Sequence, residues 1–290
     1  MSEEKLSIVI PAKNEADNLS NWLPSLVAWG GYQELIVVDD GSNDNTAKIA
    51  AGMGARVLRH PQSLGNGAAI KHGFREASGD IIVFMDADGQ HQPEDIPRLL
   101  EEMESTEADM VVGARDASGQ ASKGRHLANA FYNWFSSQVA GQKIQDLTSG
   151  FRAVKAEKFA EFLNLLPNGF SYPTTSTMAF FRSGYLVRYI SIDVQKREGK
   201  SHIRPIKDGI RFLVIIFKVA TLYSPLKVFL PISALFFMLG LCRYLYTYIT
   251  MGAFTNMSAL LMVTSVQVFL IGLVSEQITA LIYQAKSNRE

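Results

Sequence analysis

Short apolar runs alternate with longer amphipathic stretches over the first 115 residues. The runs have the length and β-branched content of buried strands, and they lie at Leu6–Ile10, Glu34–Asp39, Ala55–Arg59, Asp80–Met85 and Met110–Gly113. The stretches between them have helical spacing, at Asp17–Trp29, Asn45–Met53, Asn66–Ala77 and Pro93–Glu104. Strands that alternate with helices predict an α/β fold with a mostly parallel sheet and helices on both of its faces.

The pattern is less regular from about residue 119 to Arg204. Helices are predicted at Ala128–Ala140, Ala156–Leu165 and Pro173–Gly184, and a last strand at Leu186–Val194. We therefore expect one domain over residues 1–204. Its first residues, Met1–Lys5, carry two glutamates and lead straight into a strand, which is unlike a signal peptide and predicts that the domain stays in the cytoplasm.

A basic stretch follows this domain. Between Arg182 and Lys227 there are ten Lys or Arg residues against three Asp or Glu, although the whole chain has no net charge. Within it, Ile210–Ser224 is apolar but too short and too charged to span a membrane. Residues 205–224 are therefore predicted to form an amphipathic helix in the membrane interface, attracted to anionic head groups or to phosphate. A solvated charged face is the alternative.

The last region, residues 225–290, holds most of the excess of a hydrophobic fraction of 47%. Its segments 228–249 and 259–283 are long enough to span a bilayer. The loop between them has no charge, whereas basic residues flank their outer ends, so the positive-inside rule predicts a two-span membrane anchor with both termini in the cytoplasm. A buried helical hairpin in a soluble protein is the alternative.

Two carboxylates follow the fourth predicted strand. Asp86 and Asp88 alternate along extended chain and so point the same way, with Gln90 two residues further. Carboxylate and amide oxygens suit Mg²⁺ or Mn²⁺, which would neutralise charge on a leaving diphosphate. The five histidines have no zinc-site spacing, and the single Cys242 excludes an internal disulfide. A plain surface loop is the alternative for this Asp-x-Asp pair.

Two further turns carry polar residues that suit a nucleotide. Asp39 and Asp40 end the second strand, where they could accept hydrogen bonds from a base or a ribose, or simply form a turn. The segment Leu64–Lys71 is a glycine turn that opens a helix, and Lys71 is a predicted diphosphate contact. Its glycine spacing does not fit dinucleotide binding, because Ile70 occupies the position that requires a small residue.

These motifs, in this order, resemble family 2 glycosyltransferases of the GT-A fold, and most closely the polyprenol (dolichol) phosphate sugar synthases for mannose or glucose. The matching segments are Ile10–Glu15, Val38–Ser42, Asp86–Gln90 with Pro93 and Glu94, Gly113–Arg115, Asp146–Arg152 and Arg197–Ser201. The resemblance covers roughly residues 6–204 and is extended by the two-span tail. It implies a Rossmann-like GT-A domain that takes a nucleotide sugar.

The resemblance also implies roles for individual residues. The predicted nucleotide-sugar contacts are Pro11, Asn14, Glu15, Asp39, Asp40, Lys71 and Asp86, and the predicted metal ligands are Asp86, Asp88 and Gln90. The predicted phosphate contacts are Arg115, Arg125, Arg152, Arg197, Lys200 and Ser201. Many relatives have Ser-Lys where this chain has Ser201-His202, so one cationic contact becomes pH-dependent or is lost. Lys13 stands where an aromatic or small residue is common.

The implied reaction is inverting transfer of a sugar from a GDP- or UDP-sugar to dolichyl or undecaprenyl phosphate at the cytoplasmic face of a membrane. A lipid phosphate is already anionic, so the protein must mainly stabilise charge and orient the reactants. The predicted catalytic residues are Asp88, Asp146, Arg197 and Lys200. Asp146 is either a base or a structural residue, and the basic loop at Arg197 either grips phosphate or holds the protein on anionic lipid.

Two alternative functions remain open. A family 2 enzyme with a glycolipid or polysaccharide acceptor is one, although the Gln-x-x-Arg-Trp motif of processive synthases is missing from the sequence. A non-catalytic sugar-nucleotide sensor is the other. The expected partners are a nucleotide sugar, a polyprenyl phosphate and membrane lipids. The sequence is also compatible with a homo-oligomer or a small membrane partner. No feature of the sequence indicates nucleic-acid binding.

Overall fold

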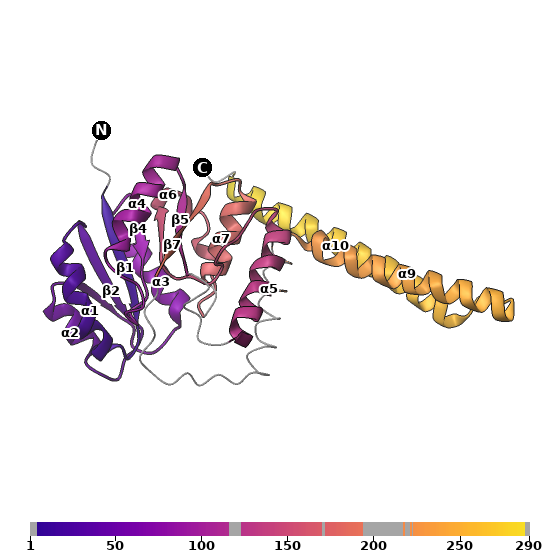
Figure 1. Ribbon diagram of the computed structural model, residues 1–290, viewed down its shortest axis with the longest axis horizontal. Coiled ribbons are helices and arrows are strands. Elements are labelled where there is room, and N and C mark those ends of the chain that lie inside the picture. Colours follow the sequence, from indigo (N-terminus) through magenta and orange to yellow (C-terminus); the bar gives the residue numbers. More distant parts are fainter. Residues whose placement is uncertain are drawn as a thin grey trace. The chain divides into compact units, whose positions relative to one another are not determined.

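The computed structural model describes residues 5–115, 123–169, 172–193, 217, 221 and 223–287. The chain divides into two compact units, one made of Met1–Phe135 with Gln142–Ile203 and the other of Ser136–Gly141 with Arg204–Glu290. The first unit contains a seven-stranded sheet in the order β3-β2-β1-β4-β6-β5-β7, with helices on both faces (Figure 1).

The strands of this sheet are short and almost all parallel. They are β1 Leu6–Ala12, β2 Glu34–Asp39, β3 Arg56–Arg59, β4 Ile81–Phe84, β5 Met110–Arg115, β6 Arg152–Lys155 and β7 Val187–Ile192. Strand β6 runs antiparallel to both β4 and β5, and the other pairings are parallel. The predicted mostly parallel α/β fold is confirmed.

Two local predictions differ from the structure. Strand β6 was not predicted, because its sequence Arg-Ala-Val-Lys has a single β-branched residue and leads directly into the predicted helix that begins at Ala156. The predicted helix Ala156–Leu165 is instead α6, Ala156–Ala160, followed by a separate 3₁₀ turn at Leu163–Leu165. In both cases packing around the sheet decides a segment whose local pattern is weak.

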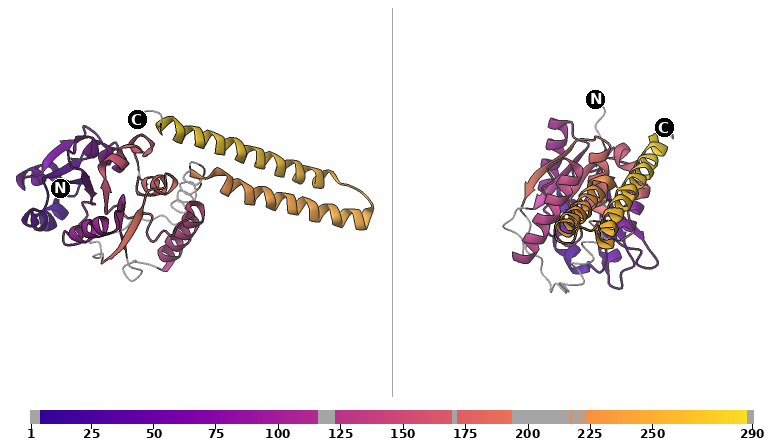
Figure 2. Two further views of the ribbon diagram at one scale, coloured as in Figure 1. Left: turned by 90° about the horizontal axis from the view of Figure 1, so that it is seen from above. Right: turned by 90° about the vertical axis from the view of Figure 1, so that its right-hand side faces the viewer.

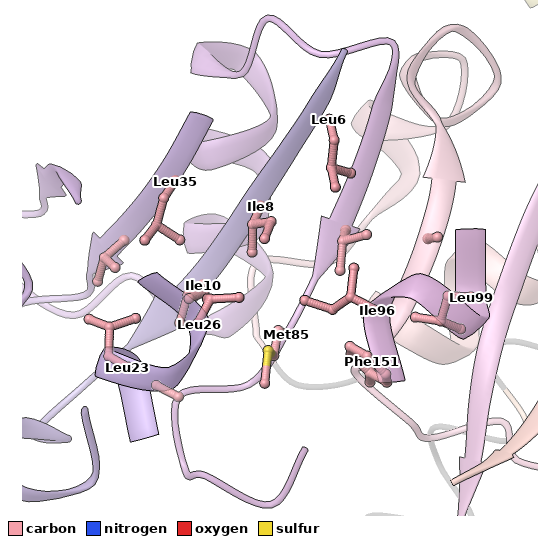
Figure 3. Packing of buried hydrophobic residues seen from close by; sticks show 14 of the residues in the cluster. Leu6, Ile8, Ile10, Leu23, Leu26, Leu35, Met85, Ile96, Leu99 and Phe151 are labelled. Atoms are coloured by element: carbon pink, nitrogen blue, oxygen red, sulfur yellow. The ribbon is translucent and has the colours of Figure 1, made fainter. Parts of the chain in front are cut away.

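One face of the sheet is covered by three helices, α1 Ala16–Trp29, α2 Thr46–Gly52 and α4 Asp95–Thr106. Their apolar stripes and alternate strand residues form one buried cluster (Figure 3). Ile8, Leu23 and Met85 in it are each fully buried. Each such side chain contributes about 1.5–3 kcal/mol relative to remaining exposed, so this layer fixes how the strands are arranged.

The opposite face is covered by α3 Asn66–Glu76, α6 and α7 Tyr172–Arg182. Gly73 of α3 lies so close to the sheet that a Cβ there would be 3.0 Å from the Val38 side chain. Aromatic rings fill the rest of the layer, with the Phe84 ring 4.9 Å from that of Phe159 and 6.1 Å from that of Tyr172.

The strand register sets where loops meet. Strands β1, β2, β4 and β5 all end at the same edge of the sheet, because they run in the same direction. Strand β6 runs the opposite way, and its first residue, Arg152, pairs with Phe84, the last residue of β4. The segment that enters β6 therefore lies beside the loop that leaves β4, at the edge where ligands bind in α/β sheets.

The second unit is built on two long helices, α9 Pro225–Met251 and α10 Asn256–Ser287 (Figure 2). The two helices form an antiparallel hairpin, because residues later in α9 contact residues earlier in α10. Leu226 N donates to Glu276 Oε2 at 3.2 Å, and Ser233 Oγ donates to Ser265 O at 2.9 Å. Residues 225–251 and 256–281 are both long and apolar enough to cross a membrane.

The base of the hairpin is tied to the last turn of α5, Lys123–Ala140, part of which belongs to the same unit. Lys227 Nζ donates to Val139 O at 2.7 Å, an ammonium at a helix C-terminus where the dipole favours positive charge. The predicted interfacial helix at Ile210–Ser224 lies almost wholly outside the described residues.

Close approach of the two long helices depends on small residues. We predict that Gly272→Leu destabilises the hairpin by about 1–3 kcal/mol, because a Cβ there would lie 2.7 Å from Phe229 Cβ. Unfolding in mixed detergent–SDS micelles measures the change. Val274→Leu is the control, since Val274 is 60% exposed on the same helix. Equal unfolding curves for the two variants would contradict this packing.

Candidate active site

The loops after β1 and β2 interlock. Asn14 has a left-handed backbone (φ 54°), a conformation that asparagine tolerates better than most residues. Its backbone N–H donates to Ser42 Oγ at 2.9 Å, and its side-chain Oδ1 accepts from Asn43 N at 2.8 Å. Glu15 N donates to Thr46 Oγ1 at 2.9 Å. The predicted nucleoside contacts Asn14 and Glu15 therefore belong to a rigid pair of loops beside Asp39.

Asp39 is buried at the end of β2. Its Oδ1 accepts from Ser42 N at 2.9 Å, which closes the turn. Its Oδ2 forms an ion pair with Arg59, whose Nε lies 3.2 Å away, but this oxygen accepts no hydrogen bond. A carboxylate oxygen in that state retains the capacity to accept a bond from a ligand. Pro11, on the neighbouring strand, pairs with Val38 and is buried.

Asp40 has a different environment from Asp39. Its carboxylate accepts four hydrogen bonds, from His60 Nδ1 at 2.7 Å, Ser63 Oγ at 2.7 Å, Leu64 N at 2.8 Å and Gly65 N at 2.9 Å. Burial alone would raise its pKa, but these donors outweigh burial and lower the pKa to about 2. This geometry favours a role in holding the 60–65 loop over the predicted contact with the nucleoside.

The glycine turn at the start of α3 does not offer the phosphate site expected from the sequence. Ala68 N donates to Asn168 O at 2.9 Å and Gly67 N to Gly169 O at 3.2 Å, so backbone donors at this helix end bind a neighbouring loop. A Cβ on Gly67 would overlap the Pro167 carbonyl oxygen. The glycines therefore serve close packing between two loops.

Lys71 faces the same loop. Its Nζ donates to Leu166 O at 3.0 Å and to the Asn168 side chain, and burial followed by the charge of Arg75 lowers its pKa. Because the ammonium is already held by oxygen acceptors of the protein, this position argues against the predicted diphosphate contact. A lysine near a glycine turn has the same sequence signature in either role.

The loop after β4 holds the predicted metal ligands in a supported turn. Asp86 is about one-third exposed, and Gln90 N donates to Asp88 Oδ1 at 3.2 Å. Trp22 of α1 donates from Nε1 to Ala87 O at 3.1 Å, and its ring lies against Gly89, which has a left-handed backbone (φ 71°). The indole thus fixes the turn from outside the loop.

The donor set of this loop fits a hard divalent cation. Asp86 and Asp88 supply carboxylate oxygens and Gln90 an amide oxygen, a set that leaves coordination positions for phosphate. Among the residues that the structure describes, no group of three His, Cys, Asp or Glu could hold a metal ion. A site here would therefore need Gln90 and ligand oxygens to complete it, as expected for Mg²⁺ or Mn²⁺ bound with a diphosphate.

Arg115 and Asp146 form a two-pronged ion pair at this edge of the sheet. Arg115 Nε lies 2.7 Å from Asp146 Oδ2, and Nη2 lies 3.0 Å from Oδ1. Thr148 N also donates to Asp146, at 3.0 Å. Burial alone would raise the pKa of Asp146, but the hydrogen bond and charge of Arg115 outweigh it and lower the pKa. A carboxylate so engaged favours the structural role of Asp146 over that of a base.

Arg115 also lies within electrostatic range of the loop that holds the predicted metal ligands. Its burial would lower its pKa, whereas the hydrogen bond and charge of Asp146, followed by the charges of Asp86 and Asp88, raise it. The structure thus brings together one arginine and three of the acidic residues predicted from the sequence. The Arg115 side chain is 28% exposed, so a ligand at this edge can reach it.

The remaining predicted cations divide into two groups. Arg152 is fully buried, and its guanidinium contacts Pro173 O at 3.0 Å and Ser176 Oγ at 2.8 Å. The buried position argues against the predicted phosphate contact and for a role inside the domain. Arg197, Lys200 and Ser201 lie outside the described residues, as does the side chain of Arg125.

Several supporting residues were not predicted. Trp22 and Tyr172 have the sequence pattern of ordinary core residues. No local signal in the sequence indicates that they bond to Ala87 O and Gly150 O, in loops far along the chain. His91 is buried, stacks on the Phe151 ring at 5.0 Å, and has Nε2 3.8 Å from Asp86 Oδ2. Its position directly after Gln90 was the one signal that could have identified it.

Comparison with known proteins agrees with this geometry. Glycosyl transferase family 2 matches residues 7–163, which contain the β1 to β6 edge described above. The chain belongs to this family. Residues 224–281, which form the α9–α10 hairpin, match the GtrB C-terminal hairpin family. The order of the two matches agrees with a GT-A domain followed by two apolar helices.

Curated relatives of this family 2 chain include a dolichol-phosphate mannosyltransferase of Pyrococcus furiosus, 35% identical over 57% of this chain and 50% of the relative. An undecaprenyl-phosphate mannosyltransferase of Micrococcus luteus is 30% identical over 66% of this chain and 83% of the relative. The chain thus spans about half the length of the first of these proteins.

A solved structure of similar fold is glucosyl-3-phosphoglycerate synthase from Mycobacterium tuberculosis in complex with Mn²⁺, uridine diphosphate and glucosyl-3-phosphoglycerate. Its TM-score is 0.60, with 21% identity over 76% of this chain and 81% of that chain. The likeness supports the GT-A fold of the first unit.

The role of Asp40 predicts a pH-dependent contribution to stability. Its folded pKa of about 2 lies below its ordinary value of 3.8, so the contribution is complete above about pH 4 and is lost as the pH falls toward 2. We expect Asp40→Asn to lower the free energy of unfolding by about 2 kcal/mol near neutral pH. The difference from wild type should shrink below pH 4, measured by urea titration of tryptophan fluorescence.

The control for this measurement is Glu101→Gln, which changes an exposed carboxylate on α4. It should leave the unfolding curve unchanged at each pH. If Asp40→Asn lowers the free energy of unfolding by the same amount from pH 7 to pH 2, packing rather than the charge accounts for its effect.

Proposed function

We propose that this protein transfers a hexose from a nucleotide sugar to a polyprenyl phosphate at the cytoplasmic face of a membrane, with Mg²⁺ or Mn²⁺. The observation that carries the proposal is the Asp86–Gln90 loop beside the Arg115–Asp146 ion pair, at the ligand-binding edge of a family 2 domain. The named relatives act on dolichol phosphate and undecaprenyl phosphate, and one structure of similar fold contains Mn²⁺ and uridine diphosphate.

The donor would be held by the loops after β1, β2 and β4. Asp39 would offer its Oδ2, which has an ion pair with Arg59 but no hydrogen bond, to a base or ribose donor, between loops that Asn14 and Glu15 fix. Asp86, Asp88 and Gln90 would hold the divalent cation, which when bound supplies Lewis-acid stabilisation of the departing diphosphate. The protein's own contribution is a turn fixed by Trp22 and Gly89, so little reorganisation is needed when the ligand arrives.

The acceptor would be a phosphate monoester that is already anionic. An oxygen of that phosphate forms a bond to the anomeric carbon while the bond from this carbon to the nucleotide diphosphate breaks, which inverts the configuration in one displacement. Arg115 would help to neutralise the incoming or outgoing phosphate, together with Arg125, Arg197 and Lys200 from the sequence prediction, and Ser201 would donate a hydrogen bond to it. No strong base is needed for this step. Asp146 agrees with this, because its ion pair with Arg115 fixes its position and its lowered pKa makes it a weak base.

A family 2 enzyme with a glycolipid or polysaccharide acceptor is the main rival. The two apolar helices would place either enzyme at a membrane, so only the acceptor itself distinguishes them. The second rival, a sensor that binds the sugar nucleotide without turnover, differs in having no product.

A product assay separates these alternatives. Membranes that contain the protein are incubated with labelled GDP- and UDP-sugars and with polyprenyl phosphates, and the lipid product is identified by mass spectrometry. We expect a glycosyl phosphoprenol from one donor. A labelled glycolipid or polymer would establish the first rival, and nucleotide-sugar binding with no labelled product would establish the second.

In the same assay, Asp88→Ala should lower transfer by roughly a hundredfold or more, because it removes one oxygen ligand of the cation that stabilises the leaving charge. The fold should survive, since Asp88 lies in a surface loop rather than in the core. Asp17→Ala, an exposed acid on α1, is the control. Near-normal turnover by Asp88→Ala, or by wild type in excess chelator, would refute the metal assignment.

The hairpin predicts opposite accessibility for its turn and its end. In a Cys242→Ser background, Asn256→Cys should react with an impermeant thiol reagent from outside intact cells, and Ser287→Cys should react only after permeabilisation. The reason is the uncharged turn and the basic residues at both outer ends. Labelling of both positions from the same side would contradict two spans.

A further inference from the structure

A buried arginine and a buried tyrosine lie behind the segment that enters β6. Tyr172, at the start of α7, donates from its hydroxyl to Gly150 O at 3.0 Å. Arg152 donates from Nη2 to Ser149 O, and its guanidinium carbon is 5.7 Å from the centre of the Tyr172 ring. Two successive backbone carbonyls are therefore held from within the domain by two side chains that contact each other.

The other side of this backbone faces the predicted metal ligand. A Cβ built on Gly150 would lie 2.8 Å from Asp86 Cγ, a distance that real Cβ atoms essentially never show. The Gly150 backbone is thus in direct contact with the Asp86 carboxylate and limits the positions that this side chain can take. Any shift of the Ser149–Gly150 segment would change where Asp86 points.

The buried guanidinium of Arg152 is held entirely by neutral groups. Pro173 O, Ser176 Oγ and Thr177 Oγ1 accept from its Nη1, at 2.8–3.1 Å. In the described part of the chain no carboxylate lies within ion-pair distance of it. Burial lowers the pKa of Arg152, and the opposing electrostatic effects come from Tyr172 and Tyr189, followed by Asp146 and Asp86. A buried charge is costly to desolvate, and these neutral acceptors together with Ser149 O offset that cost.

We propose that Tyr172 and Arg152 are positioning residues that hold the Ser149–Gly150 backbone against Asp86 and so preset this carboxylate to bind the divalent cation. Burial and the charge of Asp86 raise the pKa of Tyr172, so its hydroxyl remains a donor. Mutation of residues that orient a metal ligand typically weakens metal affinity by about 10–100-fold. The inference rests on the proposed metal-dependent function and adds residues that support the first ligand.

The direct test is metal binding rather than turnover. Full-length protein in detergent is titrated with Mn²⁺, and free Mn²⁺ is followed by its electron paramagnetic resonance signal. We expect Tyr172→Phe to weaken Mn²⁺ binding about tenfold, because it removes the bond to Gly150 O and keeps the ring. The Mn²⁺ concentration for half-maximal transfer should rise by the same factor, with kcat at saturating Mn²⁺ nearly unchanged.

Tyr132→Phe is the matched control. Tyr132 is also buried, and its hydroxyl lies 2.9 Å from Thr174 Oγ1 on the same helix, α7. Thr174 Oγ1 in turn donates to Leu147 O at 3.4 Å, whereas Gly150 O accepts from Tyr172. Tyr132→Phe should lose a similar amount of thermal stability as Tyr172→Phe and bind Mn²⁺ as wild type does. Equal loss of Mn²⁺ affinity in both variants would show a general loosening of α7 and overturn the proposal.

Gly150→Ala perturbs the same contact from the other side and does not depend on the fate of the tyrosine variant. Its Cβ should displace the Asp86 carboxylate and weaken Mn²⁺ binding. Wild-type affinity in both Gly150→Ala and Tyr172→Phe would overturn the positioning role while leaving the metal assignment intact. Wild-type protein that binds no Mn²⁺ would overturn the metal assignment, and with it this inference.

Discussion

The antiparallel pairing of β6 with β4 is the constraint on which the site depends. A fully parallel sheet would send the start of β6 to the far edge, whereas here Arg152 pairs with Phe84 and the segment 146–151 returns to the edge where β4 ends. This reversal places Gly150 against Asp86 and Asp146 against Arg115. The two halves of the site therefore come from distant parts of the sequence and meet through one strand register.

Buried charges hold this edge together, and each has a different set of hydrogen-bond partners. Asp40 is surrounded by four donors, Asp146 by an arginine and a threonine, and Arg152 by carbonyl and hydroxyl oxygens. Removing a partner from any of them would leave a charge without compensation in the interior, which costs more than the bond itself is worth. The loops are thus fixed before a ligand arrives, and polar atoms such as Asp39 Oδ2 keep capacity to bind one.

The parts of the fold that follow from periodicity could be predicted from the sequence. Strands β1, β2, β4 and β5 are apolar runs, and the positions of Asp39, Asp86 and Asp88 follow from where those runs end. Local pattern could not distinguish a cation that binds a ligand from one that supports the fold. Lys71 and Arg152 stand in motifs typical of phosphate binding, yet both are held by protein oxygens, because loops far along the chain supply acceptors that no local window contains.

This distinction changes how the proposed reaction would balance its charge. A nucleotide sugar and a lipid phosphate together bring several negative charges to an edge that already carries Asp39, Asp86 and Asp88. Arg115 is partly committed to Asp146, and two of the cations predicted from the sequence are engaged inside the domain. In the proposed reaction, most of the compensation would then come from the divalent cation and from the predicted phosphate contacts Arg197 and Lys200. Without the cation, a site of this kind would be negatively charged and would repel both the donor diphosphate and the acceptor phosphate, so productive binding would depend on the metal.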